Sequence, residues 1–84
     1  LVMAIIRNLN HKPVVLKGMG WSNSTLYQNI RKELFVAPVK LGPRASRWLS
    51  DEQAAVQAAY IAGNSPEEIR ALVRKLHAAR KEPL

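Results

Sequence analysis

Two groups of polar and basic side chains have types and spacing suited to binding a polyanion. The first combines short hydroxyl and amide groups with cations and no acid, and consists of Asn23, Ser24, Thr25, Tyr27, Gln28, Arg31 and Lys32. The second holds the cations Lys40, Arg44 and Arg47. Such groups read base edges in the major groove of DNA and contact phosphates. The alternative for the first group is an ordinary solvated helix face.

The first group needs a helix to present it. A helix from about residue 23 to residue 34 would place Leu26, Ile30 and Leu34 on one apolar stripe, with the polar group opposite. Gly20 suits the left-handed end of a preceding helix over residues 13–19, and Ser22 suits the N-cap of the next. Two helices joined by so sharp a turn form a helix-turn-helix.

The second group needs a hairpin. The short runs 39–41 and 45–48 favour extended structure, and the intervening Gly42-Pro43-Arg44 has turn chemistry. The cations then lie on or beside the hairpin tip. A basic hairpin directly after a helix-turn-helix is typical of a wing, whose tip contacts the sugar-phosphate backbone or a minor groove.

These features together resemble the AlpA family of prophage and mobile-element regulators, winged-helix proteins related in fold to phage excisionases and MerR-type DNA-binding domains. The resemblance covers roughly residues 13–56 and is carried by Gly20-Trp21-Ser22, Ser24-Thr25-Leu26-Tyr27, Pro38-Val39-Lys40-Leu41-Gly42, Arg44 and Trp48. It implies a recognition helix over residues 23–32 and a wing over residues 40–47. The chain departs from the family pattern at Gln28, where a basic residue is usual, and at Arg47, where a small one is usual. Base preference is therefore not carried over.

Charge is distributed unevenly along the 84 residues. Residues 1–48 hold eight Lys or Arg and one acid, a net charge of 8 − 1 = +7, whereas residues 49–84 hold five of each sign. The whole excess of positive charge thus lies in the predicted helix-turn-helix and wing, which indicates a nucleic-acid partner. The chain has no cysteine, so disulfides and thiolate metal sites are excluded.

The remaining residues are assigned to an arm and to a C-terminal helical hairpin. Residues 1–12 are expected to form an arm, either an added strand or an unstructured tail, and residues 13–84 a single domain. Capping boxes of Ser50 with Gln53 and of Ser65 with Glu68 predict helices over about 51–62 and 66–81. The last helix has an apolar stripe that either folds back on the domain or pairs with another protomer; it consists of Ile69, Leu72, Val73 and Leu76.

No arrangement of residues indicates catalysis. His11 and His77 lack metal-ligand spacing and are expected at the surface, and no base is spaced to activate a serine. Trp21 and Trp48 are expected to pack in the core, whereas Tyr27 is expected to contact the ligand. We therefore expect a non-enzyme without a metal or a cofactor.

The sequence thus predicts a mainly α-helical winged helix-turn-helix with a small β-hairpin and a C-terminal helical hairpin. The expected function is sequence-specific binding and bending of double-stranded DNA, as an excisionase in DNA recombination, in transcription regulation, or in both. Self-association along DNA and contact with an integrase or recombinase are further expected partnerships, in the bacterial cytoplasm and nucleoid, with no membrane partner. The alternative is a protein-interaction module whose C-terminal helices bind a repressor or recombinase, with DNA contact secondary.

Overall fold

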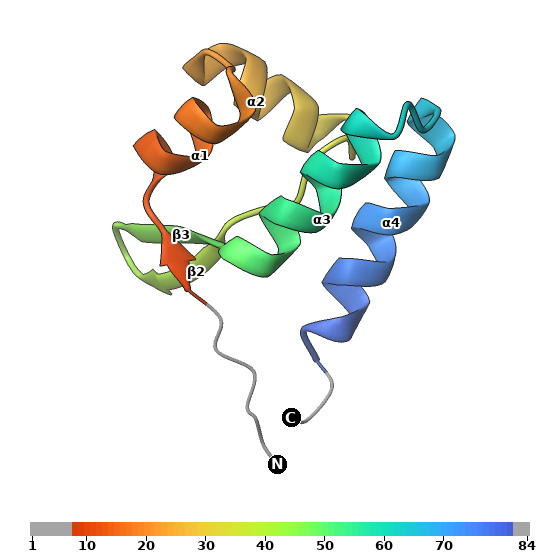
Figure 1. Ribbon diagram of the computed structural model, residues 1–84. Coiled ribbons are helices and arrows are strands. Elements are labelled where there is room, and N and C mark those ends of the chain that lie inside the picture. The colour runs from red at the N-terminus through yellow and green to blue at the C-terminus, as the bar shows by residue number, and fades with distance from the viewer. Residues whose placement is uncertain (1–7, 82–84) are drawn as a thin grey trace.

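Four helices and three short strands make up residues 8–81, the part of the chain that this computed structural model describes (Figure 1). In chain order they are β1 (Leu9–Asn10), α1 (Lys12–Met19), α2 (Asn23–Arg31), β2 (Val39–Gly42), β3 (Ala45–Leu49), α3 (Ser50–Ile61) and α4 (Pro66–Ala79). The expected mainly helical architecture with a small sheet is confirmed. The predicted arm lies outside the described residues over positions 1–7.

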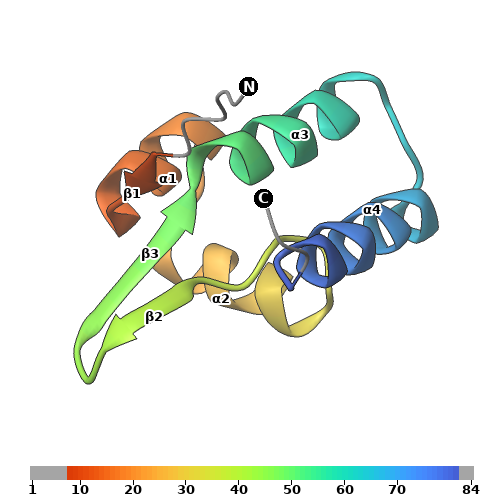
Figure 2. The ribbon, with the colours of Figure 1, turned by 90° about the horizontal axis from the view of Figure 1, so that it is seen from below.

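The strands form one antiparallel sheet in the order β1-β3-β2. Leu9 pairs with Leu49 and Asn10 with Trp48, so the end of the predicted arm is an added strand. The β2–β3 hairpin has an irregular register beside its turn, where the pairing of Lys40 with Ser46 is followed by that of Gly42 with Ala45. Figure 2 shows that the hairpin tip projects beyond the helices.

The turn between α1 and α2 forms as predicted. Gly20 has φ 70° at the end of α1, and the Ser22 hydroxyl accepts from the Thr25 amide at 3.3 Å at the start of α2. Gly18 has a packing reason to lack a side chain, because a Cβ there would lie 2.6 Å from the Gln53 amide nitrogen. The glycine that weakens α1 locally therefore lets α3 approach it closely.

The predicted end of α2 at residue 34 is wrong, because the helix ends at Arg31. Glu33 adopts the left-handed conformation, with φ 61°, and the Leu34 amide donates back to Asn29 O at 2.8 Å. This pair of features closes the helix three residues early. Lys32 accordingly lies at the C-cap and not in the helix.

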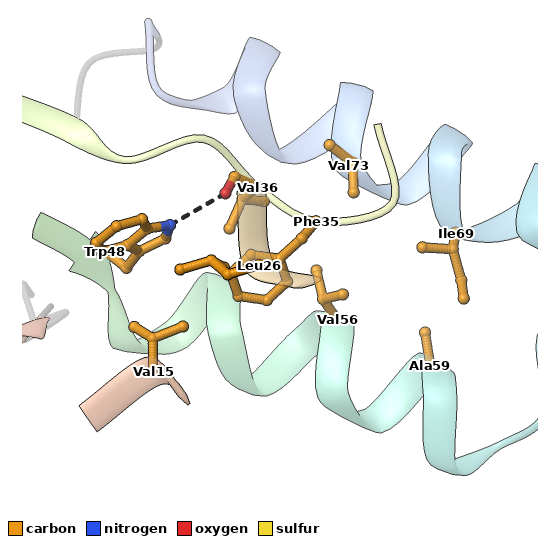
Figure 3. Close-up of a cluster of buried hydrophobic side chains, with 9 residues drawn as sticks. All are labelled: Val15, Leu26, Phe35, Val36, Trp48, Val56, Ala59, Ile69 and Val73. Carbon is orange, nitrogen blue, oxygen red and sulfur yellow. Dashed lines mark hydrogen bonds between the residues drawn. The ribbon is translucent and has the colours of Figure 1, made fainter. Parts of the chain in front are cut away.

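The core lies between all four helices and β3 (Figure 3). Trp48 is 1% exposed, which confirms its expected core position, and its indole N–H donates to Val36 O at 3.2 Å. Trp21 is partly buried and meets the Phe35 and Tyr60 rings edge to face at 5.2 and 5.9 Å. Both tryptophans therefore belong to the fold, as expected.

Helix α4 folds back on the domain. Ile69 is 2% and Val73 0% exposed, and Leu72 and Leu76 pack against the same core. The alternative in which this stripe pairs with another protomer is therefore wrong. The capping box of Ser65 with Glu68 is present, and the helix ends at Ala79, two residues before the predicted position.

The predicted capping box at Ser50 is wrong. Leu49 is the N-cap of α3, and the Ser50 hydroxyl accepts from the Asn8 amide at 3.2 Å. The Gln53 side chain is buried and accepts from the Asn10 amide group at 3.0 Å. Asn10 of β1 and Asn8, just before that strand, thus bind both side chains that the sequence assigned to the cap.

Residues 32–38, hereafter the link, join α2 to β2 without helix or strand structure, and side chains from three other elements bind their backbone. The Tyr60 hydroxyl donates to Leu34 O at 2.7 Å, and burial raises the pKa of that hydroxyl. The Ala37 amide donates to His77 Nε2 at 3.0 Å, and the Arg80 guanidinium donates to Ala37 O at 2.6 Å. His77 is consequently half-buried and not at the surface as predicted.

Arg80 also joins the link to α3. Its guanidinium forms an ion pair at 2.6 Å with the carboxylate of Glu52, and Glu52 is 0% exposed. Burial of an acid is costly unless it is paired and hydrogen-bonded, so this contact fixes α4 against α3.

Protonation of His77 is expected to destabilise the fold. Burial, and then the charge of Arg80, lowers the pKa of this imidazole from its ordinary 6.5, against opposing effects of Glu52 and Glu33. The neutral ring accepts the Ala37 amide, which an imidazolium cannot do. Because the unfolded chain binds the proton more readily, the stabilisation is complete above pH 6.5 and is lost as the pH falls through the lower pKa of the folded state.

Urea unfolding at about pH 7.5 and about pH 5 measures this effect. The free energy of unfolding should be smaller at the lower pH, and the difference should shrink in His77→Gln. An equal pH dependence in both chains would contradict the prediction.

Candidate nucleic-acid interface

A groove of about 300 Å³ runs between the start of α1, the exposed side of α2 and the β2–β3 hairpin. Its walls are rich in donors and contain no acid: the lining residues are His11, Lys12, Pro13, Tyr27, Arg44, Ser46, Arg47 and Trp48. Trp48 forms part of the floor of the groove, because its side chain is buried in the core. A groove with this lining fits an anionic ligand.

The predicted contact residues of α2 face solvent. Asn23, Ser24, Gln28 and Arg31 are exposed, whereas Thr25 is half-buried. The Thr25 hydroxyl lies 2.9 Å from that of Ser22, so it belongs mainly to the helix cap. The exposed face of α2 is thus polar and basic from its first turn to its last.

Tyr27 is the predicted α2 residue that enters the groove. It is 36% exposed, which places its ring at the border between protein and solvent. The Lys12 ammonium lies 5.4 Å from the ring centroid, within the range of a cation–π contact. The Tyr27 ring therefore holds the Lys12 ammonium over its face, at the groove.

The hairpin cations divide between the groove and open solvent. Arg44 is exposed in the turn and Arg47 is half-buried on β3, and both line the groove. The Arg47 guanidinium donates to Ser46 O at 3.0 Å, which restrains it along the strand. Lys40 is exposed on β2 outside the groove lining, and Lys32 is exposed at the end of α2.

His11 and Lys12 were missed by the sequence reasoning, which assigned them to the arm. Both line the groove, because β1 returns the chain to the sheet and α1 begins beside the hairpin. The signal was the pair of basic or titratable residues just before Pro13, at the start of the first predicted helix. A helix start gave no reason to expect the hairpin nearby.

The acids that form ion pairs within residues 8–81 do so with arginines of α4 and its C-terminal end. Within residues 8–81, the ion pairs join Arg70 to Glu67, Arg74 to Glu33 and Arg80 to Glu52. The hydrogen bonds and charge of Arg74 lower the pKa of the Glu33 carboxyl. Glu33 is the single acid of residues 1–48, and it is bound by α4. The described cations of α1, α2 and the hairpin take part in none of these pairs.

Residues 8–81 contain neither a cluster of metal-ligating side chains nor a helix that could span a membrane. No group of three or more His, Cys, Asp or Glu side chains within residues 8–81 could hold a metal ion. No helix in that range is long and apolar enough to cross a membrane. Comparisons with models of known protein families, with curated proteins and with solved structures gave no match.

Removal of the Lys12 charge should weaken polyanion binding more than removal of a cation elsewhere. Lys75 is a matched control, since it is an exposed lysine of α4 that does not line the groove. Lys12→Gln should elute from heparin at a lower salt concentration than Lys75→Gln, with folding of both checked by thermal melting. Equal elution of the two variants would show that the groove is not the anion site.

Proposed function

We propose that this chain binds double-stranded DNA as a winged helix-turn-helix protein, with α2 as the recognition helix and the β2–β3 hairpin as the wing. The observation that carries the proposal is the acid-free groove between these two elements, lined by Lys12, Arg44 and Arg47. A duplex presents phosphates along each strand at regular spacing, so one groove flanked by a polar helix and a basic hairpin matches it.

The geometry supports different roles for the two elements, with α2 contacting bases and the hairpin contacting the DNA backbone. Gln28 and Arg31 are exposed on α2 and carry the planar groups that bond to base edges. The projecting hairpin carries Lys40 and Arg44 at positions suited to the backbone or a minor groove (Figure 2). The ring of Tyr27 and the ammonium of Lys12 lie between these elements, where a phosphate would pass.

The likeness to the AlpA pattern extends the proposal to a biological role. We infer that the chain acts in a prophage or integrative element of a bacterium, as an excisionase, a transcription regulator or both, and without catalysis. Binding and bending of DNA serve either role. Self-association along DNA, or contact with a recombinase, belongs to the same proposal and requires surfaces other than the buried α4 stripe.

The alternative of a protein-interaction module, with DNA contact secondary, loses its main support. That reading relied on the apolar stripe of α4, and Ile69 and Val73 of this stripe are buried in the core. DNA contact is only secondary in that alternative, so it gives the exposed cations of α2 and the hairpin a minor role. DNA binding as the main function makes those cations the contact residues.

The proposal is tested by the salt dependence of binding to a duplex. If about five to seven cations neutralise phosphates, log K against log salt should have a slope of roughly −4 to −6. Mobility-shift titrations with non-specific duplex at low salt, repeated with the genomic flanks of the gene, measure it. A slope near zero would remove DNA as the main partner.

Substitutions on α2 and on the hairpin should have different effects. Gln28→Ala or Arg31→Ala should cost about 1–3 kcal/mol on the preferred site and relax discrimination there. Lys40→Ala and Arg44→Ala should weaken preferred and scrambled duplexes alike, because phosphates carry no sequence information. Equal losses on both duplexes for the α2 variants would show that the reading face is assigned wrongly.

A further inference from the structure

The end of α2 is closed by a glutamate where two other helices use glycine. After each of the helices α1, α2 and α3, a backbone amide donates to the carbonyl oxygen of the residue five positions earlier. These bonds join Trp21 to Leu16 O at 3.1 Å, Leu34 to Asn29 O at 2.8 Å and Asn64 to Ala59 O at 3.1 Å. The residue before each amide has a positive φ, 70° at Gly20, 61° at Glu33 and 80° at Gly63. The same closing motif thus ends three helices, and its left-handed residue is a glycine in two of them and a glutamate in the third.

Glu33 adopts this conformation at a cost. It has the single positive φ of a non-glycine residue within residues 8–81, and a Cβ makes the left-handed region unfavourable. Its ion pair with Arg74 joins side chains that are 48% and 64% exposed, and exposed pairs add little stability. Net stabilisation therefore does not explain a glutamate at this position.

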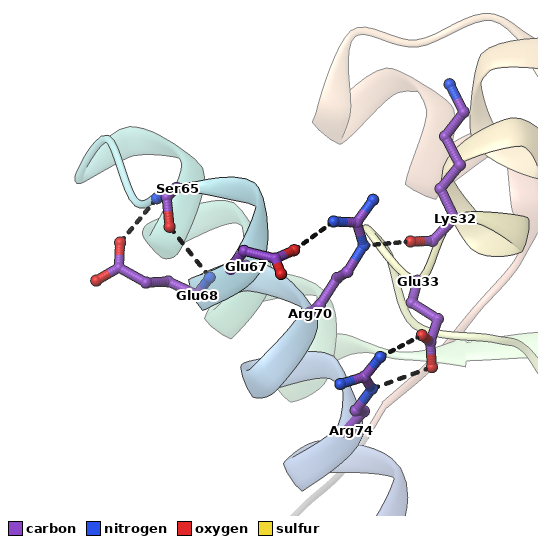
Figure 4. A network of polar contacts seen from close by, with 7 residues as sticks. All are labelled: Lys32, Glu33, Ser65, Glu67, Glu68, Arg70 and Arg74. Carbon is purple, nitrogen blue, oxygen red and sulfur yellow. Dashed lines mark hydrogen bonds and ion pairs between the residues drawn. The ribbon is translucent and has the colours of Figure 1, made fainter.

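The contacts of Glu33 suggest another role. Arg74 binds both carboxylate oxygens, with nitrogen to oxygen distances of 2.7 and 3.3 Å (Figure 4). One turn earlier on α4, Arg70 donates to Lys32 O at 2.9 Å and pairs with Glu67 at 2.5 Å. Two adjacent residues at the end of α2 are thus bound by two side chains of α4.

We propose that Glu33 and Arg74 form a tether that fixes α2 on α4 and so positions the α2 contact residues for DNA; this inference rests on the proposed DNA-binding function. A glycine at position 33 would keep the turn but free its backbone, and it would lose the carboxylate. The tether restricts the hinge at which the chain leaves α2 and enters the link. Both residues are positioning residues, acting through α2.

Positioning and simple electrostatics predict opposite results for one substitution. Removing an acid from a DNA-binding protein should raise its affinity, because less charge opposes the phosphates. Removing the tether should lower affinity, because a smaller fraction of molecules holds α2 in the binding orientation. The affinity of Glu33→Gly therefore distinguishes positioning from electrostatics. The left-handed backbone at position 33 accommodates glycine, so the turn itself is kept.

The experiment compares Glu33→Gly, Arg74→Gln, the double variant and Lys75→Gln by duplex affinity and thermal melting. Glu33→Gly should weaken binding about fivefold if the competent fraction falls to about one fifth, with a melting temperature close to that of the original chain. Arg74→Gln should weaken binding beyond Lys75→Gln, which removes the same charge one residue away. The double variant should bind the duplex as tightly as the weaker-binding single variant, because each single substitution already removes the same tether.

Hydrogen exchange supplies a readout that needs no DNA. Amides at the end of α2, among them Lys32 and Leu34, should exchange faster in Glu33→Gly and Arg74→Gln than in Lys75→Gln. Unchanged or higher affinity of Glu33→Gly, or unchanged exchange in both tether variants, would overturn the inference. If the original chain bound no duplex, the proposed function and the positioning role would both fail, whereas faster exchange would still show the mechanical tether.

Discussion

The link between α2 and the β2–β3 hairpin depends on hydrogen bonds that come from elsewhere in the chain. A segment without helix or strand leaves its amide and carbonyl groups unsatisfied unless other groups bind them. Here Tyr60 of α3 binds Leu34 O and Trp48 of β3 binds Val36 O. His77 of α4 and Arg80 at its C-cap bind the two backbone groups of Ala37. The orientation of α2 relative to the hairpin is therefore set by β3 of the hairpin and by the elements that follow it in sequence.

This dependence gives the two C-terminal helices a role that their neutral charge does not suggest. Helix α4 supplies apolar side chains to the core and cations to the link, and it binds Glu33 through Arg74. The described cations of α1, α2 and the hairpin take part in no ion pair within residues 8–81. The described ion pairs thus leave the positive charge around the groove available, which supports the proposed binding of a polyanion.

Burial of Glu52 shows how the fold couples these parts. The carboxylate pairs with Arg80, whose guanidinium also binds Ala37 O, so a single arginine connects α3, α4 and the link. His77 lies one turn earlier on α4 and accepts the amide of the same residue. A polar cluster of this kind is sensitive to the loss of any one partner.

The local elements of this protein could be read from its sequence, because their signals lie within a few residues. Gly20 and Ser22 specify the turn between α1 and α2, Ser65 with Glu68 specifies the start of α4, and the turn chemistry around Pro43 specifies the hairpin. The contact residues on α2 followed from helical periodicity, and the structure places most of them in solvent.

Tertiary structure alone decided the features that depend on residues far apart in the chain. Pairing of β1 with β3 took Ser50 and Gln53 away from the predicted cap, and it brought Lys12 to the groove. Contacts with α4 accompany the early end of α2 at Arg31. The left-handed residue that closes the helix is Glu33, a residue type that gives no local signal for such a turn. Such outcomes depend on packing partners 40 or so residues away, which local propensity does not encode.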